Sequence, residues 1–388
     1  MSDSDPLVIV GGGAGGLSVA RSYRDAGGPA EVILLAEEGV APYQRPPLSK
    51  DFLRGETDRD ELWLEQPGWY EEQRITLRPA RAQALDPTAR ELRLDSGELL
   101  VYGSCALACG SRALRPDIPG LDDPAVLALR SLQDAEDLVT RTCAPGTRVV
   151  VIGSGFVGCE AAASLSMRGA TTTLVTDEEQ PHAARLGPEV GERIAGWLRD
   201  AGVELALGAG VERLERGDEG VEVVVAGGRR IAAQVVLAAL GAQARVELAE
   251  EAGLELALGG VAVDASMRTS APAVWAVGDI AAAEHPGAGR RIRVEHWGDA
   301  LTQGEVAGRV MAGQDAAWDS APGFWSTIGT HTLKYAAWGD GHDVVRFEPS
   351  ASSAFAVSYE RTGQLVGALA HEHDEHYEQG RRRLEHGG

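Results

Sequence analysis

Lysine is almost absent from this sequence. The 388 residues include 36 lysines and arginines, yet only Lys50 and Lys334 are lysines. An ammonium group is a compact point charge, whereas a guanidinium is a planar fork of donors. Because arginine carries nearly all of the positive charge, the lysine that ends the segment PYQRPPLSK (42–50) indicates a site that requires an ammonium.

Positive charge, cysteine and long apolar runs are also scarce. The net charge of −22 argues against nucleic acid and anionic membranes as partners, because both would repel the chain. No apolar run reaches the length of a membrane span, and the start, MSDSDPLVIV, lacks the basic residues and longer apolar core of a secretory signal. The four cysteines form no CxxC pair, so we expect a cytoplasmic protein without structural disulfides.

Glycine, in contrast, is abundant, with 49 residues in a chain long enough for two or three domains. Residues 7–10 predict a buried parallel strand, GGGAGG follows with the spacing Gly11-x-Gly13-x-x-Gly16, and a helical pattern continues to about residue 26. A second strand candidate, EVILLA, leads into Glu37, where a dinucleotide fold places a carboxylate for ribose hydroxyls. The glycines of such a motif allow a tight turn, close approach of a pyrophosphate and close packing of helix on strand. Strand, helix, strand and acid in this order predict dinucleotide binding.

The same unit recurs further along the chain. The strand candidate RVVVI (148–152) precedes Gly153-x-Gly155-x-x-Gly158. Two fingerprints predict two dinucleotides, and the commonest functional pair is a tightly held FAD and an exchangeable nicotinamide nucleotide. The alternative is one working site plus a decayed duplicate.

A third signature, TSAPAVWAVGDI (269–280), ends in Gly278 and Asp279. Alone it is only a turn, although it would let the backbone approach a ligand while the aspartate accepts hydrogen bonds. The segments GGGAGG, PYQRPPLSK, GSGFVGCE, VWAVGD and RVEHWGDALTQGEVAG, in this order, resemble the FAD-dependent, NADH-using ferredoxin reductases of oxygenases and cytochromes P450. Apoptosis-inducing factor is also similar to that family.

The resemblance runs through nearly the whole chain and implies an α/β fold of the pyridine nucleotide-disulfide oxidoreductase type. Two Rossmann-like dinucleotide-binding domains, one for FAD and one for NAD, would be followed by a C-terminal α+β domain. Because the NAD domain would interrupt the FAD domain, the expected order is the first part of the FAD domain (1–114), the NAD domain (115–243), the second part of the FAD domain (244–316) and the C-terminal domain (317–388).

Carried over residue by residue, the resemblance also implies the cofactor contacts. Glycines 11, 13 and 16 would hold the FAD pyrophosphate, and Glu37, with Glu38 as its rival, would bind the adenosine ribose. Arg45 would contact the flavin cofactor, and Asp279 would hold the ribityl chain. The other implied contacts to FAD or the nicotinamide nucleotide are Ala14, Ala82 through its backbone, Gly110, Gly153, Gly155, Phe156, Val157, Gly158, Gly241, Gly278, Glu295, His296 and Trp297.

Lys50 acquires a role from the same resemblance, which places it by the flavin ring and pairs it with Glu160. A buried ammonium there would hydrogen-bond to the reactive flavin nitrogen and offset negative charge on the reduced ring, while the glutamate keeps the lysine charged. Lys50, Glu160 and Trp297 are therefore the expected catalytic residues. The alternative for Lys50 is an exposed lysine at the start of a helix.

The choice of nicotinamide nucleotide depends on the end of the second strand of the second unit. NADH users of the family often carry glutamate where this chain has Thr176, and the acids Asp177, Glu178 and Glu179 follow. A 2′-phosphate would meet three carboxylates, so we expect NADH rather than NADPH, with Asp177 replacing the usual acid. The alternative is that these acids only solvate a loop.

Three features depart from the family pattern or lie outside it. Cys109 replaces a threonine, and we interpret it as a packed, structural residue. Phe324 and Trp325 would either line the route by which electrons leave the flavin or belong to the core of the C-terminal domain, which we favour. The tract HEHDEH (371–376) suggests a metal site, but we interpret it as a solvated polar turn and expect no metal.

The resulting hypothesis is a flavoprotein reductase that takes hydride from NADH onto flavin N5 and passes electrons singly to a [2Fe-2S] ferredoxin. Arginine clusters at residues 290–293 or 381–383 would have to meet an acidic ferredoxin. The alternatives are another acceptor (rubredoxin, a quinone or a small molecule) or a slow NADH-sensing flavoprotein similar to apoptosis-inducing factor. The family contains monomers and homodimers, and the sequence does not choose between them.

Overall fold

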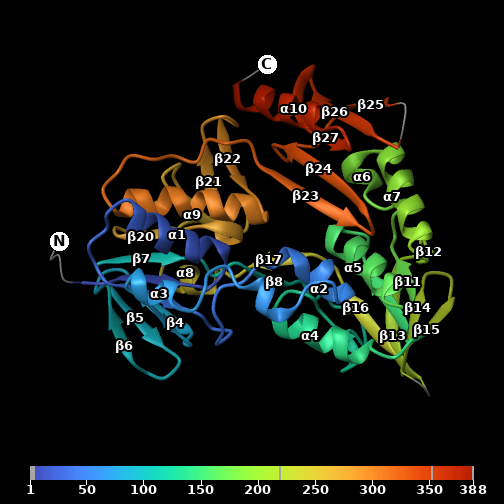
Figure 1. Cartoon of the computed structure of the whole chain (residues 1–388), viewed down its shortest axis with the longest axis horizontal. Helices are drawn as coiled ribbons and strands as arrows, with labels where there is room; N and C mark the ends of the chain where they lie inside the picture. The colour runs from blue at the N-terminus through green and yellow to red at the C-terminus, as the bar shows by residue number, and fades with distance from the viewer. Residues whose placement is uncertain (1–4, 218–219, 351–352, 387–388) are drawn as a thin grey trace.

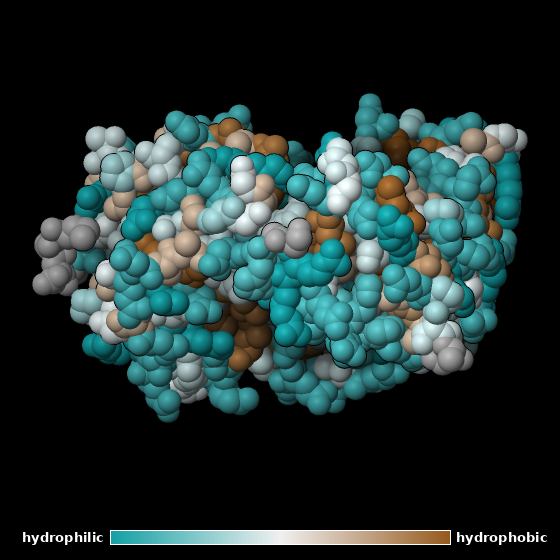
Figure 2. Space-filling view, turned by 90° about the horizontal axis from the view of Figure 1, so that it is seen from above, coloured by the Kyte–Doolittle hydropathy of each residue, from teal (hydrophilic) through white to brown (hydrophobic). Residues whose placement is uncertain are grey.

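The computed structural model of the chain describes residues 5–217, 220–350 and 353–386. The α/β prediction is confirmed: two parallel sheets, each covered by helices, are followed by an antiparallel sheet and a final helix (Figure 1). Within the described ranges, no helix is both long and apolar enough to cross a membrane. The face seen in Figure 2 is mostly hydrophilic, with hydrophobic residues in small patches, as expected for a chain of this charge.

The first parallel sheet contains the strand predicted at residues 7–10. Its first two strands are short runs of leucine, isoleucine and valine that are buried at every position, as parallel strands covered on both faces require. The last strand to join comes from far along the chain, so the second parallel unit is inserted between strands of the first. The strand order is β3 (Ile75–Arg78), β2 (Val32–Leu35), β1 (Leu7–Val10), β7 (Ser104–Leu107) and β20 (Val274–Ala276).

The second parallel sheet repeats this design. Its central strand has the bounds predicted from RVVVI, and the helix that follows begins directly after Gly155, so that it contains Gly158, the last glycine of the second motif. The strand order is β12 (Glu204–Ala206), β11 (Thr171–Val175), β10 (Arg148–Ile152), β16 (Val235–Ala238) and β9 (Val126–Leu127). Its helices are α4 (Leu132–Arg141), α5 (Phe156–Met167), α6 (Ala183–Leu186) and α7 (Pro188–Asp200).

A two-stranded antiparallel ribbon joins the two units. The chain leaves the first unit along β8 (Ser111–Ala113) and returns along β17 (Ala242–Ala244), so the two crossings lie side by side in the middle of the molecule (Figure 1). Three smaller antiparallel or mixed sheets extend the two units. One contains β4 (Ala82–Asp86), β5 (Glu91–Leu94) and β6 (Leu99–Val101), and another contains β13 (Val211–Gly217), β14 (Gly220–Val225) and β15 (Arg230–Ala233). The third contains β18 (Leu256–Ala257), β19 (Gly260–Val263), β21 (Ala281–His285) and β22 (Arg290–Arg293). Short helices are α2 (Asp51–Arg54), α3 (Trp69–Glu72) and α8 (Glu247–Glu251).

The C-terminal segment forms an antiparallel sheet, and helix α10 (Asp374–His386) packs mainly against two of its strands, β24 (His331–Ala337) and β27 (Gln364–His371). Strand β23 lies at the edge of this sheet and faces the second unit, where it packs on α5 (Figure 1). The strand order is β23 (Gly323–Ile328), β24 (His331–Ala337), β27 (Gln364–His371), β26 (Phe355–Arg361) and β25 (Val344–Pro349).

Two long helices pack in very close contact beside the first sheet, α1 (Ala14–Asp25) and α9 (Trp297–Met311) (Figure 1). Glycines make this approach possible. A Cβ added at Gly304 would lie 2.5 Å from the carbonyl oxygen of Gly15, and one at Gly308 would lie 2.5 Å from that of Val19. The backbones therefore meet directly, and this contact fixes α9, whose N-terminus faces the cavity described below.

We predict that Gly308→Ala destabilises the protein, because the new methyl group would overlap backbone atoms of α1. Overpacking of this kind costs roughly 1–3 kcal/mol. The matched control is Gly196→Ala in α7, where a Cβ meets nothing within 4 Å and alanine should stabilise the helix slightly. Thermal unfolding compares the two variants, and equal melting temperatures would show that the helices are not in backbone contact.

Candidate active site

A cavity of about 1760 Å³ receives residues from the carboxyl ends of strands in both parallel sheets. Val10 and Leu35 end β1 and β2 at its wall, and Leu237 and Ala238 end β16 there. Ligands of open α/β sheets bind at this edge. Pockets for one ligand typically measure about 300–1,000 Å³, so this cavity has room for two dinucleotides.

The two glycine loops open into this cavity with the same local geometry. Gly11 and Gly153 have positive φ angles of 123° and 104°, and a Cβ at either would lie within 2.5 Å of a carbonyl oxygen across the sheet. Gly13 and Gly155, the N-cap residues of α1 and α5, have nothing within 4 Å of a Cβ position and no side-chain cap. The first N–H groups of two twelve-residue helices therefore remain available to a phosphate.

The cavity is cationic although the chain is strongly acidic. Ten basic residues line it against eight acidic ones, while the whole chain carries −22. Together with the open glycine loops, this charge balance fits two ligands that each contain a pyrophosphate, as FAD and NADH do. The basic residues are Arg45, Lys50, Arg81, Arg93, Arg112, Arg115, Arg130, Arg185, Arg245 and Arg293, and the acidic ones are Glu37, Glu38, Asp134, Glu160, Glu247, Glu251, Asp279 and Glu295.

Lys50 and Glu160 form the predicted ion pair in the wall of the cavity. Lys50 Nζ lies 2.8 Å from Glu160 Oε2 and also donates to the carbonyl oxygen of Pro46, at 3.0 Å. The lysine is 8% exposed and the glutamate 3%, which excludes the alternative of an exposed lysine. Ser49 Oγ donates to the same carboxylate oxygen at 2.5 Å, and Ser326 Oγ donates to the other, Oε1, at 2.7 Å. Donors thus fix both oxygens of this buried carboxylate.

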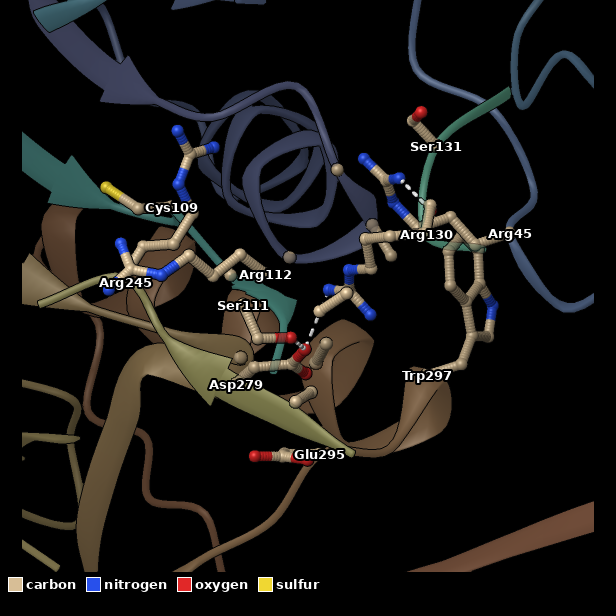
Figure 3. Close-up of a pocket in the computed structure, with 18 of the residues that line it drawn as sticks. Arg45, Cys109, Ser111, Arg112, Arg130, Ser131, Arg245, Asp279, Glu295 and Trp297 are labelled. Atoms are coloured by element: carbon tan, nitrogen blue, oxygen red, sulfur yellow. Dashed lines mark hydrogen bonds and ion pairs between the residues drawn. The ribbon is translucent and has the colours of Figure 1, made fainter. Parts of the chain in front are cut away.

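Asp279 marks a second polar cluster, drawn in Figure 3. Its Oδ2 accepts hydrogen bonds from Ser111 Oγ at 2.7 Å and from Arg130 Nη2 at 2.8 Å. The carbonyl oxygen of Arg130 in turn accepts a bond from Arg45 Nη1 at 2.6 Å. The neighbouring Gly278 N–H donates to Gln303 Oε1 at 2.8 Å, which ties this turn to α9. Ser111 and Arg130, both distant in sequence, therefore fix this carboxylate directly, while Arg45 and Gln303 hold the residues beside it.

The two rival glutamates after β2 have different partners. Both oxygens of Glu37 bind Arg245, at 2.9 and 3.0 Å, whereas Glu38 binds the hydroxyl of Tyr43 at 2.6 Å and pairs with Arg45. Glu38 is thus bound to nearby residues of its own loop, whereas Glu37 binds an arginine that is distant in the sequence. Figure 3 shows Arg245 beside Cys109. Burial raises the pKa of the Cys109 thiol to about 11, so the thiol is protonated at neutral pH, as a packed residue should be.

An aromatic wall joins α5 to the C-terminal sheet. The ring centroid of Phe156 lies 4.7 Å from that of Phe324 and 4.0 Å from that of His182. Burial lowers the pKa of His182 to about 3, so this imidazole is neutral. Phe324 and Trp325 both line the cavity, and Trp325 is 46% exposed, so assigning Trp325 to the core is wrong. Alternation along edge strand β23 turns its indole to solvent.

The acids after β11 are arranged differently from the expectation. Asp177 is exposed, and neither Asp177 nor Glu178 lines the cavity. Glu178 Oε2 instead accepts a hydrogen bond from Ser154 Oγ, in the second glycine loop, at 2.9 Å, and another from the backbone N–H of His182, at 2.9 Å. The carboxylate that reaches the loop therefore belongs to the residue after Asp177.

The HEHDEH tract is not one solvated turn, so that interpretation is wrong at His371. This residue ends β27, is buried, and its Nδ1 lies 2.9 Å from the carbonyl oxygen of Thr332, while its ring lies 4.7 Å from that of Trp197. The strand continues further than its polar sequence suggests. Across the described ranges, no group of three or more His, Cys, Asp or Glu side chains is arranged to hold a metal ion.

Most predicted site residues line this one cavity. Gly16, Gly153 and Asp177 do not; the two glycines pack against backbone, since a Cβ at Gly16 would lie 2.0 Å from the carbonyl oxygen of Gly11. Those that line it are Gly11, Gly13, Ala14, Glu37, Arg45, Lys50, Ala82, Gly110, Gly155, Phe156, Val157, Gly158, Glu160, Gly241, Gly278, Asp279, Glu295, His296 and Trp297.

Sequence reasoning missed Arg130, Ser111 and Ser326. Arg130 directly precedes the capping box of α4, formed by Ser131 and Asp134, and this box was a readable sign that the segment is fixed. No local pattern marks either serine, because their partners lie more than 160 residues away.

Comparison with known proteins agrees with this geometry. Residues 5–304 match the family of pyridine nucleotide-disulphide oxidoreductases. A 5,5'-dehydrodivanillate O-demethylase ferredoxin reductase subunit from a Sphingobium species is 34% identical over 385 residues, covering 96% of this chain and 92% of the relative.

Two solved structures are similar over almost the whole chain. The ferredoxin reductase for the CYP199A2 system from Rhodopseudomonas palustris is 32% identical, with a TM-score of 0.89, and the match covers 95% of this chain and 91% of that one. Putidaredoxin reductase, in its covalent complex with putidaredoxin, is 28% identical with a TM-score of 0.92, covering 98% and 93%. Because sequence, fold and the paired glycine loops agree, this chain belongs to the pyridine nucleotide-disulphide oxidoreductase family.

Proposed function

We propose that the protein is an NADH-dependent, FAD-containing ferredoxin reductase in the electron transfer chain of an oxygenase or cytochrome P450. When bound, FAD supplies the redox chemistry: it accepts hydride from NADH at N5 and releases electrons singly to a [2Fe-2S] ferredoxin. The observation that carries this proposal is the buried pair of Lys50 and Glu160, 2.8 Å apart, in a cavity shared by two glycine loops.

Each of the two glycine loops would bind the pyrophosphate of one ligand in this cavity. We assign the FAD pyrophosphate to the loop at Gly11 and Gly13, and the NADH pyrophosphate to the loop at Gly155, because each presents uncapped helix N–H groups. Glu37 would then bind the adenosine ribose of FAD. Asp279, oriented by two donors, would hold the ribityl chain.

The same assignment favours the expected domain order. Residues 1–114 and 244–316 would form the FAD domain, 115–243 the NAD domain and 317–388 the C-terminal domain. The crossing ribbon of β8 and β17 supports boundaries near residues 114 and 243.

Lys50 and Glu160 give this site fixed charge where water is scarce. The ammonium has two acceptors, Glu160 and the Pro46 carbonyl, so its position is set before any ligand arrives. A preorganised cation stabilises developing negative charge without reorganisation. Phe156 and Trp297 in the cavity wall would limit the positions open to the nicotinamide ring.

Ferredoxin as the acceptor is supported by the relatives, which are ferredoxin reductases. Of the two expected basic docking patches, the one at residues 290–293 is largely neutralised, since Arg290 pairs with Asp340, Arg291 with Glu284 at 3.0 Å and Arg293 with Glu295 at 2.7 Å. In the patch at residues 381–383, Arg381 pairs with Glu385 at 3.1 Å. The exposed indole of Trp325 at the cavity supports contact through aromatic rather than cationic groups. A cytoplasmic location, with no nucleic acid or membrane partner, completes the proposal.

Anaerobic stopped-flow mixing tests the function. NADH should bleach the bound flavin rapidly, and a [2Fe-2S] ferredoxin added next should reoxidise it rapidly. A long-lived reduced protein that transfers few electrons to ferredoxin would contradict the reductase and favour the sensing flavoprotein.

Replacing Lys50 and Lys334 separately tests whether the buried lysine, Lys50, acts in flavin reduction. Lys50→Met should retain FAD yet slow flavin reduction by NADH by roughly two orders of magnitude, the usual loss when a preorganised group is removed from a transition state. Lys334→Met is the matched control, since Lys334 is 38% exposed and pairs with Asp374 at the surface. Equal reduction rates in both variants would show that Lys50 does not act on the flavin.

We propose Glu178 as the acid that selects NADH, because it bonds Ser154 in the second glycine loop. Removing the Glu178 carboxylate should weaken NADH binding by about tenfold and narrow the preference over NADPH, because a charge-assisted hydrogen bond contributes about 1.5–3 kcal/mol. Asp177→Ala is the control, since Asp177 is exposed. Steady-state kinetics with both nucleotides compare the variants, and a larger effect for Asp177→Ala would restore the sequence-based assignment.

A further inference from the structure

The carboxylate of Glu160 is held by residues from two other parts of the chain. Lys50 and Ser49 donate to Oε2, and both come from the loop that precedes α2. Ser326 donates to Oε1 at 2.7 Å and comes from β23, in the C-terminal sheet, 166 residues away. Ser326 is 0% exposed and Glu160 3%, so water does not compete for these bonds.

Strand β23 meets helix α5 at two points on one face. Phe324 and Ser326 are two residues apart, so both point to the same side of the strand. Phe156 and Glu160 are four residues apart, so both lie on one side of the helix. Phe324 packs edge-on against Phe156, with ring centroids 4.7 Å apart, and Ser326 bonds Glu160. An apolar and a polar contact therefore fix the strand on the helix together.

The polar contact determines how Glu160 presents its charge. A carboxylate with donors on one oxygen only can rotate about its last torsion, whereas donors on both oxygens hold its plane. Without the Ser326 hydroxyl, Oε1 would be a buried charged oxygen lacking a donor, and the group would be expected to turn. Lys50 Nζ, whose other acceptor is a carbonyl oxygen, would move with it.

We propose that Ser326 is a positioning residue for hydride transfer, which sets the place of the Lys50 ammonium through Glu160 and so makes the C-terminal sheet part of the reaction site. This inference rests on the proposed function for its kinetic consequence but not for its structural one.

Lysine NMR tests the structural consequence without turnover. With lysine labelled at its side-chain carbons and nitrogen, the protein has only two lysine signals to assign, from Lys50 and Lys334. Ser326→Ala should shift the Lys50 signal and leave that of Lys334 in place, and Ser326→Thr, which keeps the hydroxyl, should restore it. An unmoved Lys50 signal in Ser326→Ala would overturn the proposal.

Stopped-flow reduction by NADH tests the kinetic consequence. Ser326→Ala should lower the limiting rate of flavin reduction by about tenfold, less than the roughly hundredfold cost of a 1 Å misplacement, while FAD content and the Kd of NADH stay unchanged. The control is Ser266→Ala, which removes a hydrogen bond of 2.7 Å to Ala316, just before the C-terminal sheet, without touching Glu160. An equal loss of rate in Ser266→Ala would show that Ser326 only stabilises the fold, and the positioning role would be rejected.

The last test combines variants. In the Lys50→Met background, Ser326→Ala should cause no further loss of rate, because its effect passes through the missing ammonium. Independent, additive losses would overturn the proposal. If the wild-type flavin is not reduced by NADH at all while the Lys50 signal still moves in Ser326→Ala, the proposed function fails and the positioning role stands.

Discussion

The ion pair of Lys50 and Glu160 is the constraint on which the arrangement of the chain depends. Two charges removed from water are costly unless each has its partner, and breaking such a pair leaves an uncompensated charge. The loop at residues 42–50, helix α5 and strand β23 must therefore meet for the pair and its hydroxyl donors to form. A hydrophobic contact could bring the same segments together, but it would not fix the orientation of their side chains as directional hydrogen bonds do. The ionic network instead gives the cavity a wall of fixed geometry.

A second constraint is the contrast between the whole chain and its cavity. The whole chain carries a net charge of −22, whereas the cavity collects arginines from both parallel units and from the ribbon between them. Several of these arginines are paired across the cavity, as Arg130 is with Asp279 and Arg245 with Glu37. The pair of Arg245 and Glu37 joins segments that the insertion separates in sequence, and the pair of Arg130 and Asp279 joins the inserted unit to the first one. The same contacts therefore build the cavity and hold the two units together.

The sequence predicted the repeated architecture well because its signal is local. Strand, glycine loop and helix follow one another within thirty residues, and backbone sterics demand glycine at Gly11 and Gly153. The scarcity of lysine also pointed to Lys50, whereas its pairing with Glu160 was predicted only through the family resemblance. Ser326 could not be found in the same way, since the contact that defines it is long-range and any other serine has the same local signature. The capping box after Arg130 indicates a fixed segment but does not reveal the distant partner, Asp279. Asp177 was chosen by its position in a run of three acids. The sequence does not show which of these side chains points toward the glycine loop, and in the fold it is Glu178 that bonds Ser154.

The scarcity of lysine has a practical consequence once the fold is known. Reagents that attack side-chain amines have two targets in this chain, and the side chain of Lys50 is only 10% exposed while that of Lys334 is 38% exposed. Side-chain labelling of the folded protein is therefore directed to one position, on β24 of the C-terminal sheet. A dye, a biotin or a surface linker attached there would report on or tether the molecule from a defined side, with Lys50 as an internal measure of whether the fold has opened.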